Sequence, residues 1–191
     1  MKEKILFVNS CVRGENESRT LALAKTALSR LDGDIEEIRL ADADLKPLDA
    51  AGLAKRAESA EKNDFSDPVY DCAKQFAACD TVVIAAPFWD YSFPAFLKIY
   101  IESLCVGGLT FLYGSDGVPI SYCRAKRPIY ITTSGGYIGG TDFGFEYIKT
   151  VTKSFFGIEK FSFFSAEGLD ILGNVPAAIL RAAQEKIERE L

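Results

Sequence analysis

Short apolar runs of strand length alternate along this chain with segments of helical periodicity. The clearest run is Thr81–Ala86 (TVVIAA), whose β-branched residues are typical of a strand buried in the middle of a parallel sheet. Further strands are predicted at Lys4–Asn9, Ile35–Leu40, Pro128–Thr133 and Lys160–Ser165. Five strands that alternate with helices predict an α/β fold with a doubly wound parallel sheet, right-handed connections and helices on both faces.

Apolar residues at three- and four-residue spacing, together with helix start and stop residues, predict the helices between these strands. The predicted helices cover Ser18–Leu31, Pro68–Cys79, Pro94–Val106, Tyr147–Phe156 and Val175–Leu191. Residues 41–67 are rich in Ala, Asp, Glu and Lys, and we expect an irregular crossing with a short helix there. Leu109–Tyr122 contains two glycines and a proline and predicts an excursion that projects from the domain, with a hairpin as one form.

Size and charge exclude several classes of protein. At 191 residues the chain fits one domain over 1–191, because a core of this size buries most of its apolar surface without splitting. A net charge of −5 and the lack of a long basic run argue against nucleic-acid binding. No apolar run reaches the ~20 residues of a membrane span. The first residues, MKEKILFVNS, lack the apolar region of a secretory signal, so we expect a cytoplasmic protein.

The chain contains no histidine, which narrows the chemistry available to it. Ser-His-Asp, Cys-His and His-metal catalysis are excluded. The five cysteines are scattered, with no C-x-x-C pair and no histidine to complete a zinc site, so we expect reduced thiols and no metal. Chemistry must therefore come from carboxylates, tyrosines, lysines or a bound cofactor.

Three unusual loops follow the first, third and fourth predicted strands. In an open parallel sheet, ligands bind beyond the carboxyl ends of the strands, at the point where the strand order reverses. With the five strands in the order 2-1-3-4-5, that point lies between strands one and three. The loops Ser10–Thr20, Pro87–Pro94 and Thr133–Tyr137 are expected to meet there.

The first loop has the composition of an anion-binding loop, although it lacks both the G-x-G-x-x-G spacing and the G-K-[ST] of a P-loop. It places hydroxyl and amide side chains just before a helix N-terminus: Ser10, Asn16, Ser18 and Thr20. Arg13 and Arg19 add positive charge, whereas Glu15 and Glu17 oppose a phosphate unless their carboxylates point to solvent. A hydroxyl-rich helix cap without a ligand is the alternative interpretation.

The second loop, PFWDYSFP, places four aromatic residues directly after a buried strand. They are Phe88, Trp89, Tyr91 and Phe93. Aromatic side chains in a proline-bounded loop suit a flat ligand, and a subunit interface is the alternative interpretation. The third loop, TTSGGY, offers hydroxyls and two glycines that let backbone N–H groups approach a polar ring edge.

Taken together and in their order along the chain, these three loops resemble those of the FMN-dependent NADH-azoreductase and NAD(P)H quinone reductase family, which has the flavodoxin-like fold. The resemblance begins with the opening loop at Ser10–Gly14 and the proline-bounded aromatic segment at Pro87–Pro94. It continues with a G-x-T-F-x-Y-like element at Gly108–Tyr113, the glycine pair Gly135–Gly136 and the segment Phe155–Gly168. The resemblance covers nearly the whole chain and implies one flavodoxin-like FMN-binding domain, with 109–122 as its excursion.

The resemblance also implies roles for individual residues. Around the FMN phosphate it places Ser10, Asn16, Glu17 and Ser18; along the isoalloxazine, Pro87, Phe88, Trp89, Asp90 and Tyr91; and at its other polar edge, Thr133, Ser134, Gly135 and Gly136. Homodimers in which the partner helps to wall the pocket are typical of the family. Substrate contacts are therefore expected from Tyr113, Tyr137, Phe155 and Phe156.

The implied activity is a ping-pong transfer of a hydride from NADH or NADPH, through the flavin N5, to a quinone- or azo-type acceptor. The protein supplies position and electrostatics, since FMN carries the chemistry. The family usually has Asn where this chain has Asp90, and Tyr where it has Trp89. Asp90, Glu15 and Glu17 place the FMN affinity in question. Two alternatives remain open: a flavodoxin-type electron carrier, and a degenerate non-catalytic member that binds FMN weakly.

Overall fold

The computed structural model describes residues 2–14, 16–140 and 142–191, and its framework is a five-stranded parallel sheet. The strands are β1 (Glu3–Asn9), β2 (Gly33–Arg39), β3 (Thr81–Ala85), β6 (Arg127–Thr133) and β7 (Ser162–Ala166). They lie in the order β2-β1-β3-β6-β7, and each neighbouring pair is parallel. When only the five strands of this sheet are numbered along the chain, their order is 2-1-3-4-5, so the predicted order is confirmed. Glu15 lies outside the described residues.

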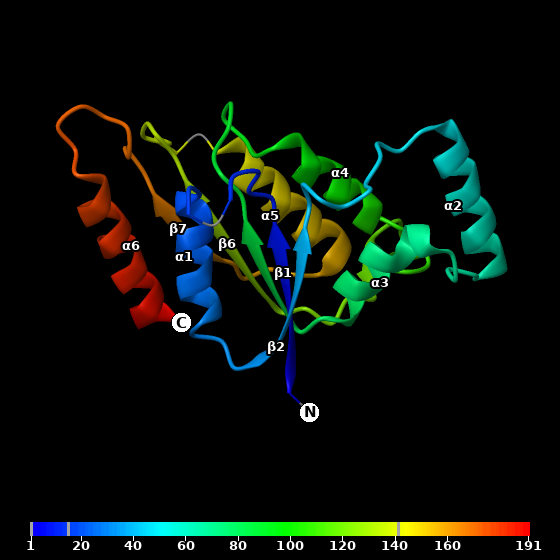
Figure 1. Cartoon of the computed structure of the whole chain (residues 1–191). Helices are drawn as coiled ribbons and strands as arrows, with labels where there is room; N and C mark the ends of the chain where they lie inside the picture. Colours follow the sequence, from blue (N-terminus) through cyan, green and yellow to red (C-terminus); the bar gives the residue numbers. More distant parts are fainter. Residues whose placement is uncertain (1, 15, 141) are drawn as a thin grey trace.

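Helices cover both faces of the sheet (Figure 1). The helices are α1 (Arg19–Leu28), α2 (Ala50–Lys62), α3 (Asp71–Ala78), α4 (Ala95–Leu104), α5 (Phe143–Phe156) and α6 (Pro176–Glu190), with a 3-10 turn at Pro68–Tyr70. α1 and α6 pack on one face, and α3, α4 and α5 pack on the other. The doubly wound arrangement expected from the sequence is therefore confirmed.

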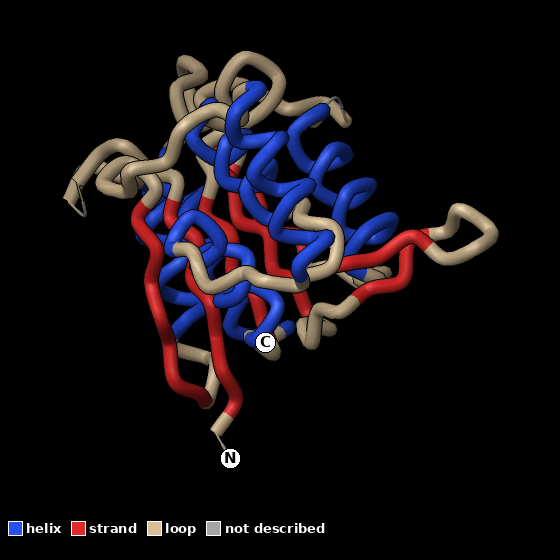
Figure 2. The backbone as a smooth tube through the Cα atoms, turned by 90° about the vertical axis from the view of Figure 1, so that its right-hand side faces the viewer, coloured by secondary structure: helices blue, strands red, loops and turns tan. Residues whose placement is uncertain are grey.

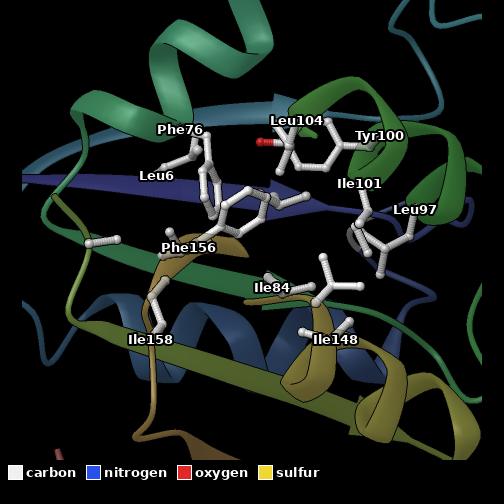
Figure 3. Close-up of a cluster of buried hydrophobic side chains, with 14 of the residues drawn as sticks. Leu6, Phe76, Ile84, Leu97, Tyr100, Ile101, Leu104, Ile148, Phe156 and Ile158 are labelled. Atoms are coloured by element: carbon white, nitrogen blue, oxygen red, sulfur yellow. The ribbon is translucent and has the colours of Figure 1, made fainter. Parts of the chain in front are cut away.

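The central strands divide their side chains between two cores, because successive residues of a strand point to opposite faces. In β1, Leu6 faces α3, α4 and α5, whereas Phe7 faces α1 and α6. Ile84 of β3 joins Leu6 in the larger cluster, where the two helix-borne rings Phe76 and Phe156 lie 4.8 Å apart between centroids (Figure 3). A strand buried on both faces explains the uninterrupted apolar run of β3.

The segment 41–67 holds a longer helix than the short one expected. α2 has 13 residues, begins at the N-cap Asp49, whose side chain accepts a hydrogen bond from the Gly52 N–H, and ends at the left-handed Asn63. None of its residues is buried. The start and the end of this helix are therefore set by its capping residues, and not by burial of an apolar face.

The predicted excursion is a β-hairpin formed by β4 (Phe111–Tyr113) and β5 (Pro119–Ser121). Its two strands are antiparallel and project from the body of the domain (Figure 2). Phe111 is buried at its base, whereas Tyr113 and Ile120 are more than half exposed.

Helix α5 begins at Phe143, four residues before the predicted start at Tyr147. Asp142 is its N-cap, and the Oδ1 atom accepts a hydrogen bond from the Phe145 N–H at 2.8 Å. The other carboxylate oxygen, Oδ2, is buried and has no hydrogen-bond partner among the described residues. Burial raises the pKa of Asp142 above its ordinary value, although the cap hydrogen bonds oppose the shift.

In wild type, ionisation of the buried Asp142 carboxyl lowers the free energy of unfolding as pH rises. We expect the Asp142→Asn variant to lack this decrease, because asparagine keeps the cap oxygen without the charge. A raised carboxyl pKa means that the folded state binds the proton more tightly than the unfolded state. Asp142 thus stabilises the fold fully at acid pH, and this contribution is lost as pH rises through the folded pKa. Urea unfolding from below pH 3.8, the ordinary pKa of the carboxyl, up to neutral pH should show the stability of Asp142→Asn gaining on wild type as pH rises.

A charge-matched control for this experiment is Asp116→Asn, at an exposed position in the hairpin turn. Its unfolding free energy should follow the wild-type pH profile. Parallel profiles for Asp142→Asn and wild type would refute the account of this cap.

The five cysteines are all free, as expected from their spacing. In the described part of the chain, no group of three or more acidic or cysteine side chains is arranged to hold a metal ion. No helix within residues 2–14, 16–140 and 142–191 combines the length and apolar character that a membrane crossing requires.

Candidate functional site

The first loop connects the end of β1 to the N-terminus of α1. Asn9 shapes its start, since its Oδ1 accepts a hydrogen bond from the Cys11 N–H at 3.0 Å. Gly14 O then accepts from the N–H groups of Glu17 and Ser18, and the Ser18 hydroxyl caps α1 by accepting from the Leu21 N–H. A capped helix start of this kind directs the remaining first-turn N–H groups and the positive end of the helix dipole outward.

The second loop is a tight two-residue turn. Trp89 and Ser92 exchange both backbone hydrogen bonds, at 3.0 and 2.7 Å, and the two residues between them have positive φ angles of 50° at Asp90 and 63° at Tyr91. This is a type I′ geometry, which asparagine and aspartate adopt more readily than most residues. Asp90 therefore has a conformational reason for its place in the loop.

The turn is fixed against the N-terminus of α5. The Phe143 N–H donates to Tyr91 O at 3.0 Å. A Cβ built on Gly144 would lie 2.6 Å from the Phe93 ring and 3.1 Å from two backbone atoms of Ser92. Because Gly144 has no side chain, α5 can approach the turn this closely.

The third loop is bonded to a segment outside the three predicted loops, the start of the connection from β7 to α6. The Gly168 N–H donates to Gly136 O, and the Asp170 N–H donates to Gly135 O, both at 2.9 Å. Asn174 closes this connection through a 2.7 Å hydrogen bond to Gly168 O. A fourth chain segment therefore borders the site.

These four segments enclose a cavity of about 220 Å³ at the carboxyl ends of the strands. Its lining includes predicted residues from all three loops: Glu17, Ser18, Pro87, Phe88, Trp89, Thr133 and Gly135. It also includes Cys11, Val12, Arg13, Arg19, Thr20 and Asp170. Beneath the cavity, a 2.6 Å hydrogen bond between the Thr20 and Thr133 hydroxyls joins α1 to β6. The expected meeting of the loops is thus observed.

Six other predicted cofactor residues lie outside this lining: Ser10, Asn16, Asp90, Tyr91, Ser134 and Gly136. Asn16, Asp90 and Tyr91 are exposed. Ser10 is buried just after β1, and its hydroxyl has no hydrogen-bond partner among the described residues.

None of the four expected substrate residues lines the cavity. Tyr113 lies on the hairpin, and Phe155 and Phe156 lie at the end of α5. Tyr113 and Phe155 pack together at 6.5 Å between ring centroids, with Phe155 also 4.6 Å from Phe111. Phe156 is 1% exposed and belongs to the core, so its ring is not available to a substrate. Tyr137, the last residue of the third loop, is 69% exposed and is also absent from the lining.

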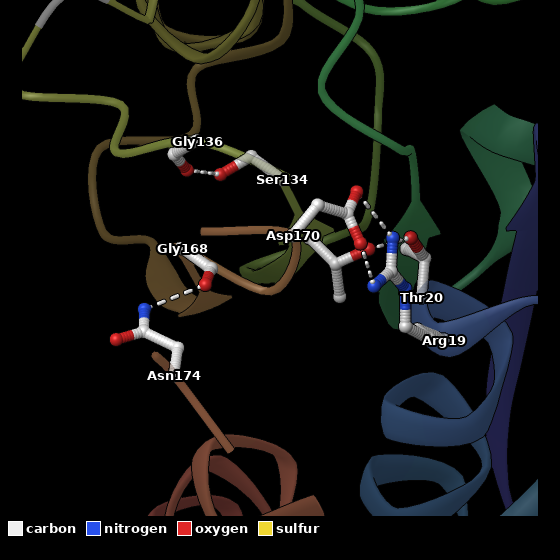
Figure 4. Close-up of polar contacts among 8 residues, drawn as sticks. Arg19, Thr20, Ser134, Gly136, Gly168, Asp170 and Asn174 are labelled. Carbon is white, nitrogen blue, oxygen red and sulfur yellow. Dashed lines mark hydrogen bonds and ion pairs between the residues drawn. The ribbon is translucent and has the colours of Figure 1, made fainter. Parts of the chain in front are cut away.

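Two arginines and two carboxylates dominate the electrostatics of the cavity. Arg19 forms a two-bond ion pair with Asp170, at 2.7 and 3.1 Å (Figure 4). These bonds lower the pKa of Asp170, and Arg13 adds to the effect. Burial raises the pKa of the Cys11 thiol, so this cysteine is uncharged at neutral pH and fits a packing role.

Asp170 is a site residue that was not predicted from the sequence. Its position depends on the pairing of β7 with β6, which places the loop after β7 beside the glycines of the third loop. The sequence AEGLD directly after the last predicted strand was the available signal, because all carboxyl ends of a parallel sheet lie at one edge.

Comparisons with known proteins agree with this architecture. The model of a family described by its flavodoxin-like fold matches residues 3–191. An FMN-dependent NADH:quinone oxidoreductase of Clostridium acetobutylicum is 32% identical over 198 residues, covering 98% of this chain and 97% of the relative. A protein of the same name from Clostridium perfringens is 29% identical and covers 96% of each chain.

Solved structures show the same fold. An azoreductase from Bacillus anthracis superposes with a TM-score of 0.82 at 21% identity, covering 98% of this chain and 97% of the other. A structure described as an FMN-dependent NADH-azoreductase from Bacillus anthracis in complex with FMN gives a TM-score of 0.80 at 22% identity, with coverage of 98% and 97%.

The sheet order and the cavity at its switch point define a flavodoxin-like protein. Within that fold, the chain belongs to the family of FMN-dependent NADH:quinone oxidoreductases. The resemblance noted in the sequence is confirmed.

Proposed function

We propose that this protein is an FMN-dependent NAD(P)H oxidoreductase that reduces quinone- or azo-type acceptors. The observation that carries the proposal is the convergence of the three loops on one cavity, with cationic and hydroxyl groups beside an aromatic wall. The full-length similarity to named quinone oxidoreductases supports it. When bound, FMN would supply the hydride-transfer chemistry that links NADH or NADPH to the acceptor.

The first loop has the donor set that a phosphate needs. Ser18, Arg19 and Thr20 line the cavity at the first turn of α1, where unpaired N–H groups and the helix dipole favour an anion. Arg13 adds a second guanidinium. The buried Ser10 hydroxyl, which lacks a partner among the described residues, is available to a ligand that reaches it. We assign the phosphate end to these residues together with Asn16 and Glu17.

The second and third loops suit a flat ring with polar edges. Phe88 and Trp89 form the aromatic wall of the cavity, beside Pro87, and Thr133 and Gly135 contribute a polar edge to its lining. Tyr91 supports this wall, since its ring lies 6.2 Å from that of Phe88. We assign the isoalloxazine to this end and extend the polar edge to Ser134 and Gly136.

The acidic departures from the family pattern are compatible with an anionic ligand. Asp90 is exposed at a left-handed turn position and does not line the cavity. Glu17 does line it, but its side chain is exposed, so that the carboxylate can face solvent. These placements favour a working FMN site over a degenerate family member.

The chain itself contributes position and charge rather than a proton-transfer group. The two arginines would compensate the phosphate charge, and the I′ turn together with the hydrogen bond from the Phe88 N–H to Thr133 O holds the aromatic wall beside the third loop. NADH or NADPH and the acceptor would take turns at the open side of this wall. Catalysis of this kind needs no histidine, in agreement with the composition.

We also propose that the protein works as a homodimer whose hairpin takes part in the interface. Apolar side chains on or beside the hairpin are exposed by 47% to 58%: Leu112, Tyr113, Val118, Ile120 and Tyr122. A cluster of this kind is typical of protein interaction surfaces. A partner chain would bring its own hairpin ring, Tyr113, toward the substrate side, as the family resemblance implies.

Initial-rate kinetics with NADH and a quinone test the proposed reaction. Because both substrates use one face of the aromatic wall, we expect ping-pong behaviour with parallel double-reciprocal lines. Intersecting lines would contradict the shared site. Anaerobic stopped-flow mixing with NADH and with NADPH separates an enzyme from an electron carrier, since the flavin of a carrier would remain oxidised.

A further inference from the structure

The structure points to a role for Asp170 that neither the fold nor the activity requires: we propose that its carboxylate competes with the FMN phosphate for Arg19. This inference rests on the proposed function, since it concerns the affinity of the same cavity for FMN. Asp170 and Arg19 both line the cavity, and they come from opposite ends of the sequence.

The geometry of the pair is the geometry that a phosphate would use. Arg19 Nη1 donates to Asp170 Oδ1 at 2.7 Å, and Nη2 donates to Oδ2 at 3.1 Å, as Figure 4 shows. A guanidinium fork binds carboxylate and phosphate through the same two parallel hydrogen bonds. While Asp170 occupies the fork, Arg19 offers a phosphate only its remaining donors.

Two features hold Asp170 in this position: a backbone hydrogen bond and the absence of a side chain at Gly135. The Asp170 N–H donates to Gly135 O at 2.9 Å, which ties the residue to the third loop. A Cβ on Gly135 would lie 2.4 Å from Asp170 Oδ2. The carboxylate therefore fills a space that exists because residue 135 is glycine.

The charges that line the cavity make the competition effective. Arg13 and Arg19 are opposed by Glu17 and Asp170, so the charged lining is balanced in sign. Asp170 is 64% exposed and Arg19 32% exposed, so the pair is partly solvated and its bonds can be exchanged for those of a stronger anion. Asp170 thus lowers the affinity for the phosphate group without closing the cavity.

The test compares Asp170→Asn with wild type in titrations with FMN and with riboflavin, which lacks the phosphate. Binding is followed by Trp89 fluorescence. We expect Asp170→Asn to bind FMN more tightly, by roughly three- to tenfold, the range for removing one partly exposed charge pair and one repulsion. Riboflavin affinity should stay the same. Asp116→Asn, which removes the same charge from the distant hairpin turn, should leave both affinities unchanged.

The Arg19→Gln background decides whether the effect acts through the guanidinium. There, Asp170→Asn should raise FMN affinity clearly less than it does in the wild-type background, because no fork remains to be released and only the direct repulsion is removed. An equal rise in both backgrounds would show that the effect does not act through Arg19. Looser FMN binding by Asp170→Asn, or equal changes for FMN and riboflavin, would mean that Asp170 clamps the cavity and would overturn the inference. Unchanged FMN affinity in Asp170→Asn would overturn it while the proposed function stands. Wild-type protein that binds neither ligand would refute the proposed function first.

Discussion

Replacing Phe156 with alanine is expected to lower the free energy of unfolding by about 3–5 kcal/mol, the range for a large buried aromatic residue. The Phe156 ring is 1% exposed and packs 4.8 Å from the Phe76 ring, in the cluster that joins the sheet to α3, α4 and α5. Truncation leaves a cavity at the end of α5. Chemical denaturation with a two-state fit measures the loss.

The neighbouring variant Phe155→Ala is the matched control. Phe155 is only partly buried, and its ring contacts Phe111 and Tyr113 of the hairpin. We expect it to cost clearly less stability and to act on dimer formation and acceptor kinetics. An equal loss of stability in the two variants would contradict the division between core and hairpin surface.

Replacing Gly144 with alanine is expected to damage both the fold and the cavity. Alanine raises helix propensity by up to about 1 kcal/mol, but here its Cβ would lie 3.1 Å from the backbone of Ser92, which cannot move without moving the turn. We expect a net loss of about 1–3 kcal/mol in stability, as for other overpacked sites. The displaced turn carries Trp89, so FMN affinity should fall about tenfold, or 1.4 kcal/mol.

Gly107→Ala is the control for this substitution. Gly107 lies beyond α4, does not have a positive φ, and a Cβ at this residue would have no neighbouring atom within 4 Å among the described residues. Its variant should stay within about 0.5 kcal/mol of wild type, with unchanged FMN affinity. A Gly144→Ala variant that behaves in the same way would show that α5 does not position the turn.

The sheet and the meeting of the loops followed from the sequence because both rest on local signals. Runs such as Thr81–Ala86 mark buried strands, and the carboxyl ends of parallel strands share one edge. The predicted start of α5 is four residues late, since Gly139, Gly140 and Gly144 resemble a continuing loop. A glycine is required inside the helix at residue 144 because its neighbours leave no room for a side chain, which is a tertiary cause.

Other features of the site depended on contacts between distant segments. Neither central residue of the type I′ turn, Asp90 or Tyr91, is a glycine, so the sequence carries no clear signal for this turn. The turn is stabilised by a hydrogen bond from the Phe143 N–H, which belongs to a distant segment. Asp170 reaches the cavity only through the pairing of β7 with β6. The burial of Phe156 in the core could have been predicted from the sequence, because this residue continues the buried stripe of Ile148 and Thr152 at four-residue spacing.

The most direct test of the central claim is an FMN titration followed by tryptophan emission. Trp89 is the single tryptophan of the chain and lines the cavity, so its fluorescence reports on that site alone. We predict saturable quenching at one FMN per chain, with weaker binding of riboflavin. Trp89 emission that does not change with FMN, after correction for flavin absorbance, would contradict the assignment of the three loops to a flavin.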